Sequence, residues 1–213
     1  MTEPTRKLFG QIVDLQARRV LAGSVEWRAG RITRIVADPA GKGGPLIMPG
    51  FVDAHIHIES SLLPPAEFAR LAVIHGTVAT VSDPHEIANV LGVAGVNYMI
   101  RDGRRTPLKF NFGAPSCVPA TAFETAGASL DATTVSRLLA RDDVRYLSEV
   151  MNFPGVLARD PSLLAMIAAA QANGKPVDGH APGLRGAEAA RYAAAGITTD
   201  HECYTLGEAQ DKL

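Results

Sequence analysis

From residue 44 onward, short apolar runs alternate with segments of helical period, and this alternation constrains the fold more than any other feature. Strands are predicted at residues 45–57, 77–82, 108–112, 144–150, 175–178 and 197–200. Helices are predicted at residues 67–75, 86–101, 133–141, 161–172, 186–195 and 206–213. Asp160 is expected to cap the start of the fourth helix, and Gly174 to follow its end. Repeated strand–helix units form parallel strands joined by crossover helices, so a doubly wound sheet and a (β/α)8 barrel both fit.

The first 48 residues follow a different pattern. Apolar runs separated by glycine-containing turn signals predict short strands at residues 11–15, 18–21, 24–28 and 31–36. No useful window in this stretch has helical period. We therefore predict a small β-sheet subdomain at residues 1–48, the N-terminal part of a β-sandwich, and an α/β domain at residues 49–213.

The composition excludes several classes of protein. With 46% hydrophobic and 20% charged residues and a formal net charge of -1, the chain is neither disordered nor a strongly basic nucleic-acid binder. Two cysteines exclude a disulfide scaffold and a cysteine-rich zinc module. No apolar run approaches the ~18 residues of a membrane span, and the N-terminus lacks the apolar segment of a signal peptide. We expect a cytoplasmic protein whose partner is a small molecule, not a nucleic acid or a membrane.

Histidines gather at the carboxyl ends of the predicted strands. Five of the six histidines stand there, namely His55, His57, His85, His180 and His201. In a barrel these strand ends converge on one face, where active sites form. Because residues two apart on a strand share a face, His55 and His57 form a chelating pair. Packing gives no reason for so many imidazoles on one face, so the pattern predicts a metal site.

Glu149 ends the predicted strand at residues 144–150 and can bridge two ions, while His180 and His201 can close the site from later strands. Imidazoles with carboxylates suit zinc, iron or manganese better than magnesium or calcium. Taken singly, each residue also has a structural explanation, as a hydrogen-bonded buried histidine or an ion-pair partner. Four neighbouring aspartates are expected to orient imidazoles or cap loops rather than bind metal. They are Asp53, Asp83, Asp178 and Asp200.

Residues beside the histidines are candidates for substrate contacts. His85 and Glu86 follow the predicted strand at residues 77–82, and Glu59 and Ser60 follow the His55–His57 pair. The alternative for His85 and Glu86 is a loop cap with a structural ion pair.

Residues 49–57 read PGFVDAHIH, which resembles the first-strand signature of the amidohydrolase superfamily. Further motifs together resemble the bacterial adenine deaminases of that superfamily. They are HIESS at 57–61, DPHEIANV at 83–90, PSCVPA at 115–120, DGHAPGL at 178–184 and DHE at 200–202. The resemblance implies a (β/α)8 metal-dependent hydrolase barrel preceded by a small β-sheet subdomain. It also implies metal-dependent hydrolytic deamination of adenine to hypoxanthine and ammonia, in purine salvage or catabolism.

The resemblance also implies roles for individual residues. His55 and His57 would hold one divalent ion, His180 and His201 a second, and Glu149 would bridge them. None of the five lysines ends the predicted strand at residues 144–150, which favours a glutamate bridge over the carbamylated lysine of many superfamily members. The ions would be Mn2+ or Fe2+, with Zn2+ as a third option. The catalytic candidates are Glu149, His85 and Glu86.

The predicted number of strands is short of a full barrel. About 165 residues remain after the N-terminal subdomain, against ~250 for eight strand–helix units, and six strands are predicted. The metal-binding aspartate that the family carries after strand eight has no counterpart here. We therefore expect the N-terminal part of an enzyme, truncated after about six strands and not fully active alone. A different cyclic-amide or nucleobase hydrolase of the superfamily, or a non-catalytic fragment, stays an alternative, and a homo-oligomer is compatible with the sequence.

Overall fold

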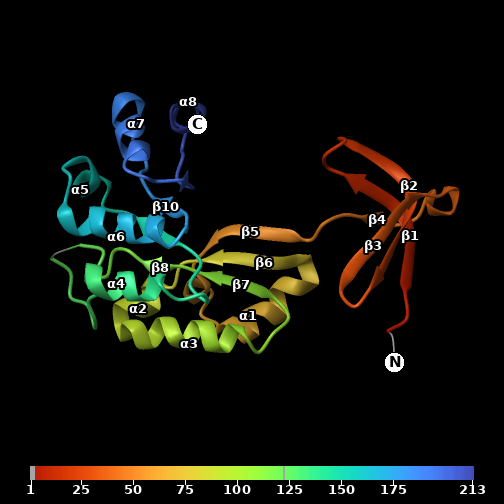
Figure 1. Cartoon of the computed structure of the whole chain (residues 1–213), viewed down its shortest axis with the longest axis horizontal. Helices are drawn as coiled ribbons and strands as arrows, with labels where there is room; N and C mark the ends of the chain where they lie inside the picture. The colour runs from red at the N-terminus through yellow and green to blue at the C-terminus, as the bar shows by residue number, and fades with distance from the viewer. Residues whose placement is uncertain (1–2, 122) are drawn as a thin grey trace. The chain divides into compact units, whose positions relative to one another are not determined.

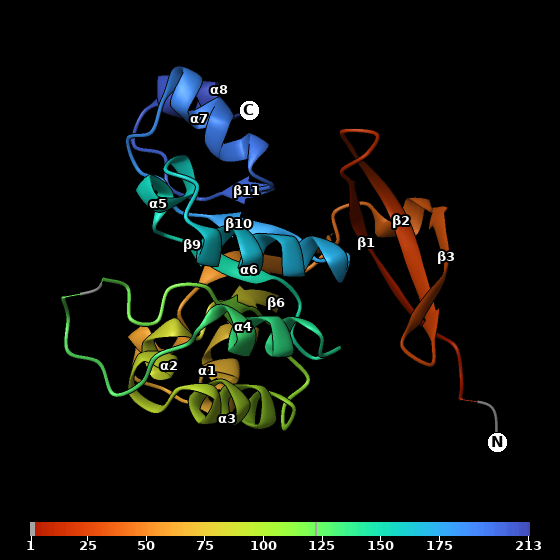
Figure 2. The same ribbon diagram turned by 60° about the vertical axis from the view of Figure 1, so that its left-hand side comes forward.

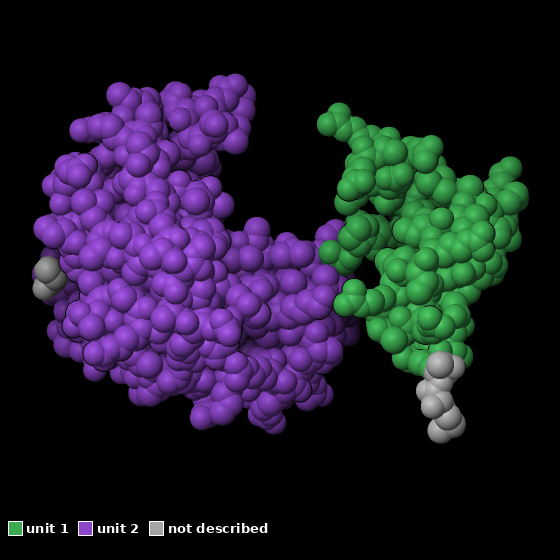
Figure 3. All heavy atoms as spheres, in the orientation of Figure 1, with its two compact units in different colours: residues 1–50 green, residues 51–213 purple. Residues whose placement is uncertain are grey.

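The computed structural model describes residues 3–121 and 123–213. The chain divides into two compact units, Met1–Gly50 and Phe51–Leu213 (Figure 3). Within the described ranges, no helix has both the length and the apolar character needed to cross a membrane.

The N-terminal unit is a four-stranded sheet with the order β3-β2-β1-β4. Its elements are β1 (Arg6–Asp14), β2 (Arg19–Arg28), β3 (Arg31–Ala37), the 3-10 turn η1 (Pro39–Gly41) and β4 (Leu46–Ile47) (Figure 1). The pairs β1–β2 and β2–β3 are antiparallel, and β4 runs parallel to β1. The predicted break between residues 21 and 24 is wrong, because β2 continues through Gly23. A Cβ at Gly23 would lie 2.5 Å from the Val36 carbonyl oxygen, so the glycine serves close packing within a strand and not a turn.

The predicted strand at residues 45–57 is two strands that belong to different units. β4 pairs with β1, whereas β5 (Phe51–Ile56) pairs with a strand of the second unit. Pro49 lies between them and has no N–H to donate to a ladder, which ends the first strand.

The second unit contains parallel strands in chain order. They are β5, β6 (Thr77–Ser82), β7 (Lys109–Phe112), β8 (Ala114–Pro115), β9 (Leu147–Val150), β10 (Val177–Gly179) and β11 (Thr199–Asp200). They form one sheet of order β5-β6-β7 and a second of order β11-β10-β9-β8. The two sheets join at Gly113, whose N–H donates to the Ser82 carbonyl at 3.0 Å, while the N–H of Ala114 donates to the Tyr146 carbonyl at 2.8 Å. The segment from β7 to β8 therefore acts as one strand position between β6 and β9.

Helices cover the sheets and supply most of the core. They are α1 (Pro65–Ala72), α2 (His85–Leu91), α3 (Val93–Gly103), α4 (Ala132–Leu139), α5 (Phe153–Leu157), α6 (Pro161–Ala172), α7 (Gly186–Ala194) and α8 (Leu206–Lys212), with the 3-10 turns η2 (Ile58–Ser61) and η3 (Val73–His75). Figure 1 shows α1 and α3 on one side of β5, β6 and β7, and Figure 2 shows α6 beside β9 and β10. Val96, Val135, Leu147, Ile167 and Val177 are fully or almost fully buried where helices meet strands.

Three local features explain which helix predictions are confirmed and which are wrong. The predicted helix at residues 86–101 is divided at Gly92, whose φ of 59° and ψ of -141° leave the helical region. The helix at residues 161–172 is confirmed, and the Asp160 carboxylate caps it by accepting from the N–H groups of Ser162 and Leu163. Helix α5 was not predicted, because its five residues are too few to show a period.

β9 is shorter than the predicted strand at residues 144–150. The Val144 N–H donates to the Arg141 carbonyl, so these residues form a turn after α4 before the strand begins.

Candidate metal centre

The carboxyl ends of four parallel strands bring four histidines and a glutamate together. His55 lies in β5 and His57 just after it; His180 and His201 follow β10 and β11 directly. Glu149 lies in β9 and is only 3% exposed. The alternation of strand side chains places His55 and His57 on one side, as their spacing predicts.

Glu149 belongs to three groups of three candidate donors, one of them with Asp83 and His85, and the other two contain the predicted metal ligands. In the first, its Oε1 lies 2.5 Å from His55 Nε2 and 2.9 Å from His57 Nε2. In the second, its Oε2 lies 3.8 Å from His180 Nδ1, and its Oε1 lies 3.3 Å from His201 Nε2. Within each group the donor atoms all lie within 4.8 Å of one another. All five residues that the sequence singles out as metal ligands are thus brought to one place.

The close contact of these carboxylate and imidazole groups shifts their pKa values. Burial acts to raise the pKa of Glu149, but hydrogen bonds from His201, His55 and His57 outweigh it and hold that pKa far below its usual range. Burial acts to lower the pKa of both His55 and His201, but hydrogen bonds to Asp178 and Glu149 raise them to about 9 and about 10. A buried anion ringed by imidazole nitrogens is a donor set that divalent transition metals prefer, so these residues fit a pair of ions.

The four aspartates lie where the sequence analysis expects supporting groups. Asp178 Oδ2 forms a hydrogen bond with His201 Nδ1 at 3.2 Å and lies 3.4 Å from His55 Nδ1, and Asp178, His55 and His201 together form a further group of candidate metal donors. Asp83 Oδ2 lies 3.0 Å from His85 Nδ1.

The other two aspartates hold backbone. Asp53 accepts from the N–H of His55. Asp200 accepts from the N–H groups of Ala181 and Glu202, one residue after each histidine of the second group.

Of the four residues predicted to contact the substrate, His85 faces the histidine cluster, and the other three take part in hydrogen bonds at the start of α2. The ring of His85 lies 4.5 Å from the ring of His57 and faces the cluster. Glu86, in the first turn of α2, accepts a hydrogen bond at 2.8 Å from Oγ of Ser60, which lies in η2. Glu59 Oε1 accepts from the Ile87 N–H at 3.2 Å, which gives Glu59 a role in holding the first turn of α2. Burial raises the pKa of Glu59.

Two supporting residues were not found from the sequence. The Tyr192 hydroxyl donates to the Val150 carbonyl at 2.7 Å and accepts from the His180 N–H at 3.1 Å, so it ties β9 to the residue that follows β10. Ser116 Oγ donates to the Glu149 carbonyl at 2.5 Å. In the sequence, Tyr192 has the pattern of an ordinary buried residue of an amphipathic helix. No neighbouring residue indicates that its hydroxyl forms these hydrogen bonds.

A parallel α/β fold that gathers imidazoles and carboxylates at its strand ends is typical of metal-dependent hydrolases. More specifically, the amidohydrolase family model matches residues 46–212, and the chain belongs to this family. An adenine deaminase of Salinibacter ruber is 61% identical over 207 residues, covering 97% of this chain and 38% of that protein. An adenine deaminase of Methanosarcina mazei is 53% identical over 208 residues, covering 98% and 37%. The chain therefore spans less than two fifths of the length of these relatives.

Solved structures share the fold at low identity. An N-acetyl-D-glucosamine-6-phosphate deacetylase from Mycobacterium smegmatis superposes with a TM-score of 0.62 at 18% identity, covering 91% of this chain and 59% of that one. The N-acetylglucosamine-6-phosphate deacetylase from Pasteurella multocida gives a TM-score of 0.57 at 12% identity, covering 92% and 56%. At these identities the likeness concerns the α/β fold with parallel strands and not the substrate.

Proposed function

We propose that this chain is the N-terminal part of a metal-dependent adenine deaminase, which hydrolyses adenine to hypoxanthine and ammonia. The observation that carries the proposal is the pair of donor groups that share the buried Glu149. The high identity to proteins named adenine deaminase, over almost the whole chain, supports the choice of substrate.

We propose that His55 and His57 hold one divalent ion, that His180 and His201 hold the other, and that Glu149 bridges the two. Mn2+ or Fe2+ are the proposed ions, with Zn2+ as the alternative, because imidazole and carboxylate donors accept all three. Bound there, the ions would supply Lewis-acid activation of water near neutral pH. Asp178 supports this arrangement, since it can accept from the outer nitrogens of His55 and His201 and so fix their tautomers.

His85 and Glu86 are the proposed groups for substrate binding and proton movement. Replacing the C6 amine of adenine by oxygen releases ammonia, so a proton must reach the leaving nitrogen. His85 is held by Asp83 and lies beside His57, where its ring can hydrogen-bond a purine placed against the cluster. Glu86, paired with Ser60, stands at the same strand end and can accept or return a proton.

We propose that the parallel strands are the first six positions of a (β/α)8 barrel. They follow chain order from β5 to β11, and the helices between them lie against the strands, as successive barrel units do. The remaining units, and a strand-end aspartate that completes the metal site, would come from the rest of a longer chain.

The test separates the metal site from the reaction. Metal analysis of the 213-residue chain is expected to find two ions per chain, and ammonia release is measured on the longer protein that contains it, with adenine, hydantoin and dihydroorotate as substrates. Turnover of adenine with inert hydantoin and dihydroorotate supports adenine deamination. Turnover of a cyclic amide with inert adenine would instead make the protein another hydrolase of the family. Two ions without turnover of any of the three would contradict the proposed reaction.

A further inference from the structure

Helix α8 connects to the two loops that carry the second histidine pair. Lys212, in its last turn, donates from Nζ to the carbonyl oxygens of Ala181 and Glu202, both at 2.7 Å. Ala181 follows His180 directly, and Glu202 follows His201 directly. One ammonium group therefore joins the backbone just after each of these two histidines.

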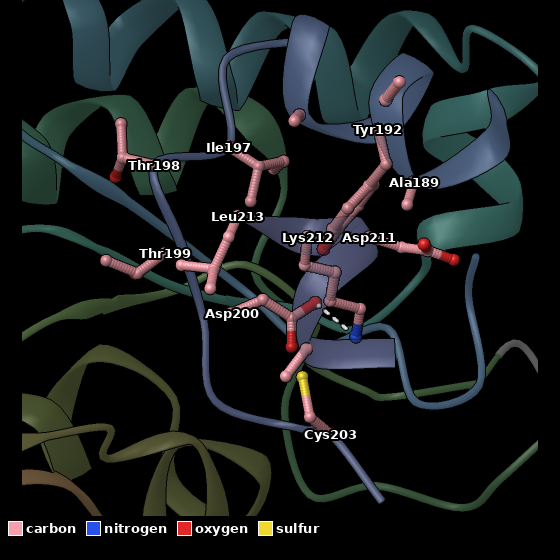
Figure 4. A pocket seen from close by; sticks show the side chains of 13 residues that line it. Ala189, Tyr192, Ile197, Thr198, Thr199, Asp200, Cys203, Asp211, Lys212 and Leu213 are labelled. Carbon is pink, nitrogen blue, oxygen red and sulfur yellow. Dashed lines mark ion pairs between the residues drawn. The ribbon is translucent and has the colours of Figure 1, made fainter. Parts of the chain in front are cut away.

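Two carboxylates complete this arrangement. Lys212 Nζ lies 3.2 Å from Asp200 Oδ2 and 3.3 Å from Glu208 Oε1. Glu208 also accepts from the N–H groups of Gly183 and Tyr204, at 2.7 Å and 3.0 Å. The carboxylate of Glu208 thus reaches the same two loops as the ammonium of Lys212. In Figure 4, Lys212 extends toward Asp200 beside a cavity of about 710 Å3, and the dashed line marks their ion pair.

These charges are almost fully removed from water. The side chains of Lys212, Asp200 and Glu208 are 10%, 8% and 3% exposed. Burying an ion pair costs desolvation energy and is weak evidence of a stabilising purpose, whereas removing one partner leaves an uncompensated charge. Here the hydrogen bonds of Lys212 and Glu208 reach the backbone of the loops that follow His180 and His201. The charged groups therefore hold these two loops in place.

We propose that Lys212, with Glu208 and Asp200, forms a clamp that sets the separation of His180 and His201. Lys212 is then a positioning residue for the second metal ion, and it acts through the backbone and not by coordination. The inference rests on the proposed two-ion site. It predicts that loss of the Lys212 charge weakens the ion held by His180 and His201 while the ion held by His55 and His57 stays bound.

The test compares Lys212→Met with a matched lysine variant in the same chain. Lys175 Nζ also donates to two carbonyl oxygens, those of Leu139 and Arg141, but these lie outside the histidine loops, so Lys175→Met is the control. The readouts are metal content by mass spectrometry, stepwise Zn2+ dissociation constants by competition with a chelator, and the visible absorption of the Co2+-loaded chain. In Lys212→Met we expect one of the two dissociation constants to rise about 10–100-fold, the range found when groups that support metal ligands are lost. The corresponding Co2+ spectrum should change, and Lys175→Met should match the unaltered chain.

Lys212→Arg is the rescue variant, because it restores a cation that can donate to both carbonyls, and it should recover part of the lost affinity. If Lys212→Met does not fold, Glu208→Gln serves in its place, since it removes the charge and keeps the size of the side chain. Equal affinity for both ions in the variant and the unaltered chain would overturn the clamp. Equal weakening of both ions, or the same loss in Lys175→Met, would also overturn it. Failure of the unaltered chain to bind two ions would instead overturn the proposed function on which the clamp rests.

Discussion

Glu149 Oε1 lies 2.5 Å from His55 Nε2, although β9 and β5 belong to different sheets of the second unit. The same oxygen faces His57 and His201, so one buried carboxylate is the shared partner of histidines from both ends of the strand order. Replacement of this single group should therefore disturb both donor groups at once.

Glu149→Gln should weaken binding of both ions, because an amide cannot bridge two cations as an anion. The loss should exceed the roughly 10–100-fold that removal of a supporting group costs. Metal content after dialysis against a weak chelator measures it. Glu188→Gln is the control, since Glu188 is exposed on α7 and pairs only with Arg191 among the described residues. Retention of two ions per chain by Glu149→Gln would show that Glu149 does not bridge them.

Asp178→Asn should weaken metal binding by about 10–100-fold without abolishing it. The amide keeps the shape of the side chain but no longer places a negative charge beside the outer nitrogens of His55 and His201. Competition with a chromophoric chelator measures the dissociation constants, with the exposed Asp142→Asn as control. An unchanged affinity would remove Asp178 from the support of the histidines.

Metal loading should stabilise the second unit. An ion that binds only the folded state adds about 2.7 kcal/mol to the free energy of unfolding at 100 times its dissociation constant. Thermal unfolding with Mn2+ or Zn2+, and then with excess chelator, measures the shift. Hydrogen exchange should place the added protection within Phe51–Leu213, because every candidate donor group among the described residues lies there. Protection confined to Met1–Gly50 would contradict the site.

Tyr192→Phe should lower the free energy of unfolding by about 1–3 kcal/mol, because it leaves the His180 N–H and the Val150 carbonyl without their buried partner. Chemical denaturation measures the change. Tyr98→Phe is the comparison, since Tyr98 is exposed and should change stability little. If the two variants are equally stable, the Tyr192 hydroxyl does not hold β9 to the His180 loop.

Asp160→Ala should destabilise the chain by about 1 kcal/mol through loss of the cap on α6. Asp160→Asn should cost much less, because asparagine also accepts hydrogen bonds from the first turn of a helix. Denaturation midpoints of the two variants give the comparison. Equal losses would mean that the charge, and not the hydrogen bonds, stabilises this helix.

Local signals in the sequence were sufficient for much of the fold. The apolar runs placed β6, β7, β9, β10 and β11 within a few residues, whereas the two-residue strand β8 was not predicted. The bounds and N-cap of α6 follow from Asp160 before it and Gly174 after it. The strand and helix predictions failed at glycines whose structural role depends on the residues around them. Gly23 continues a strand because Val36 packs against it, whereas Gly92 ends a helix because of its backbone angles.

The sequence by itself determined which side chains stand at the strand ends, because strand period and turn residues are local properties of the chain. It therefore named the histidines, Glu149 and the supporting aspartates as a group. Only the tertiary structure decided that Asp178 lies against one histidine of each pair, and that Lys212 and Tyr192 hold the His180 loop. Such partners are set by how strands and helices pack across long stretches of sequence, and no local pattern records that packing.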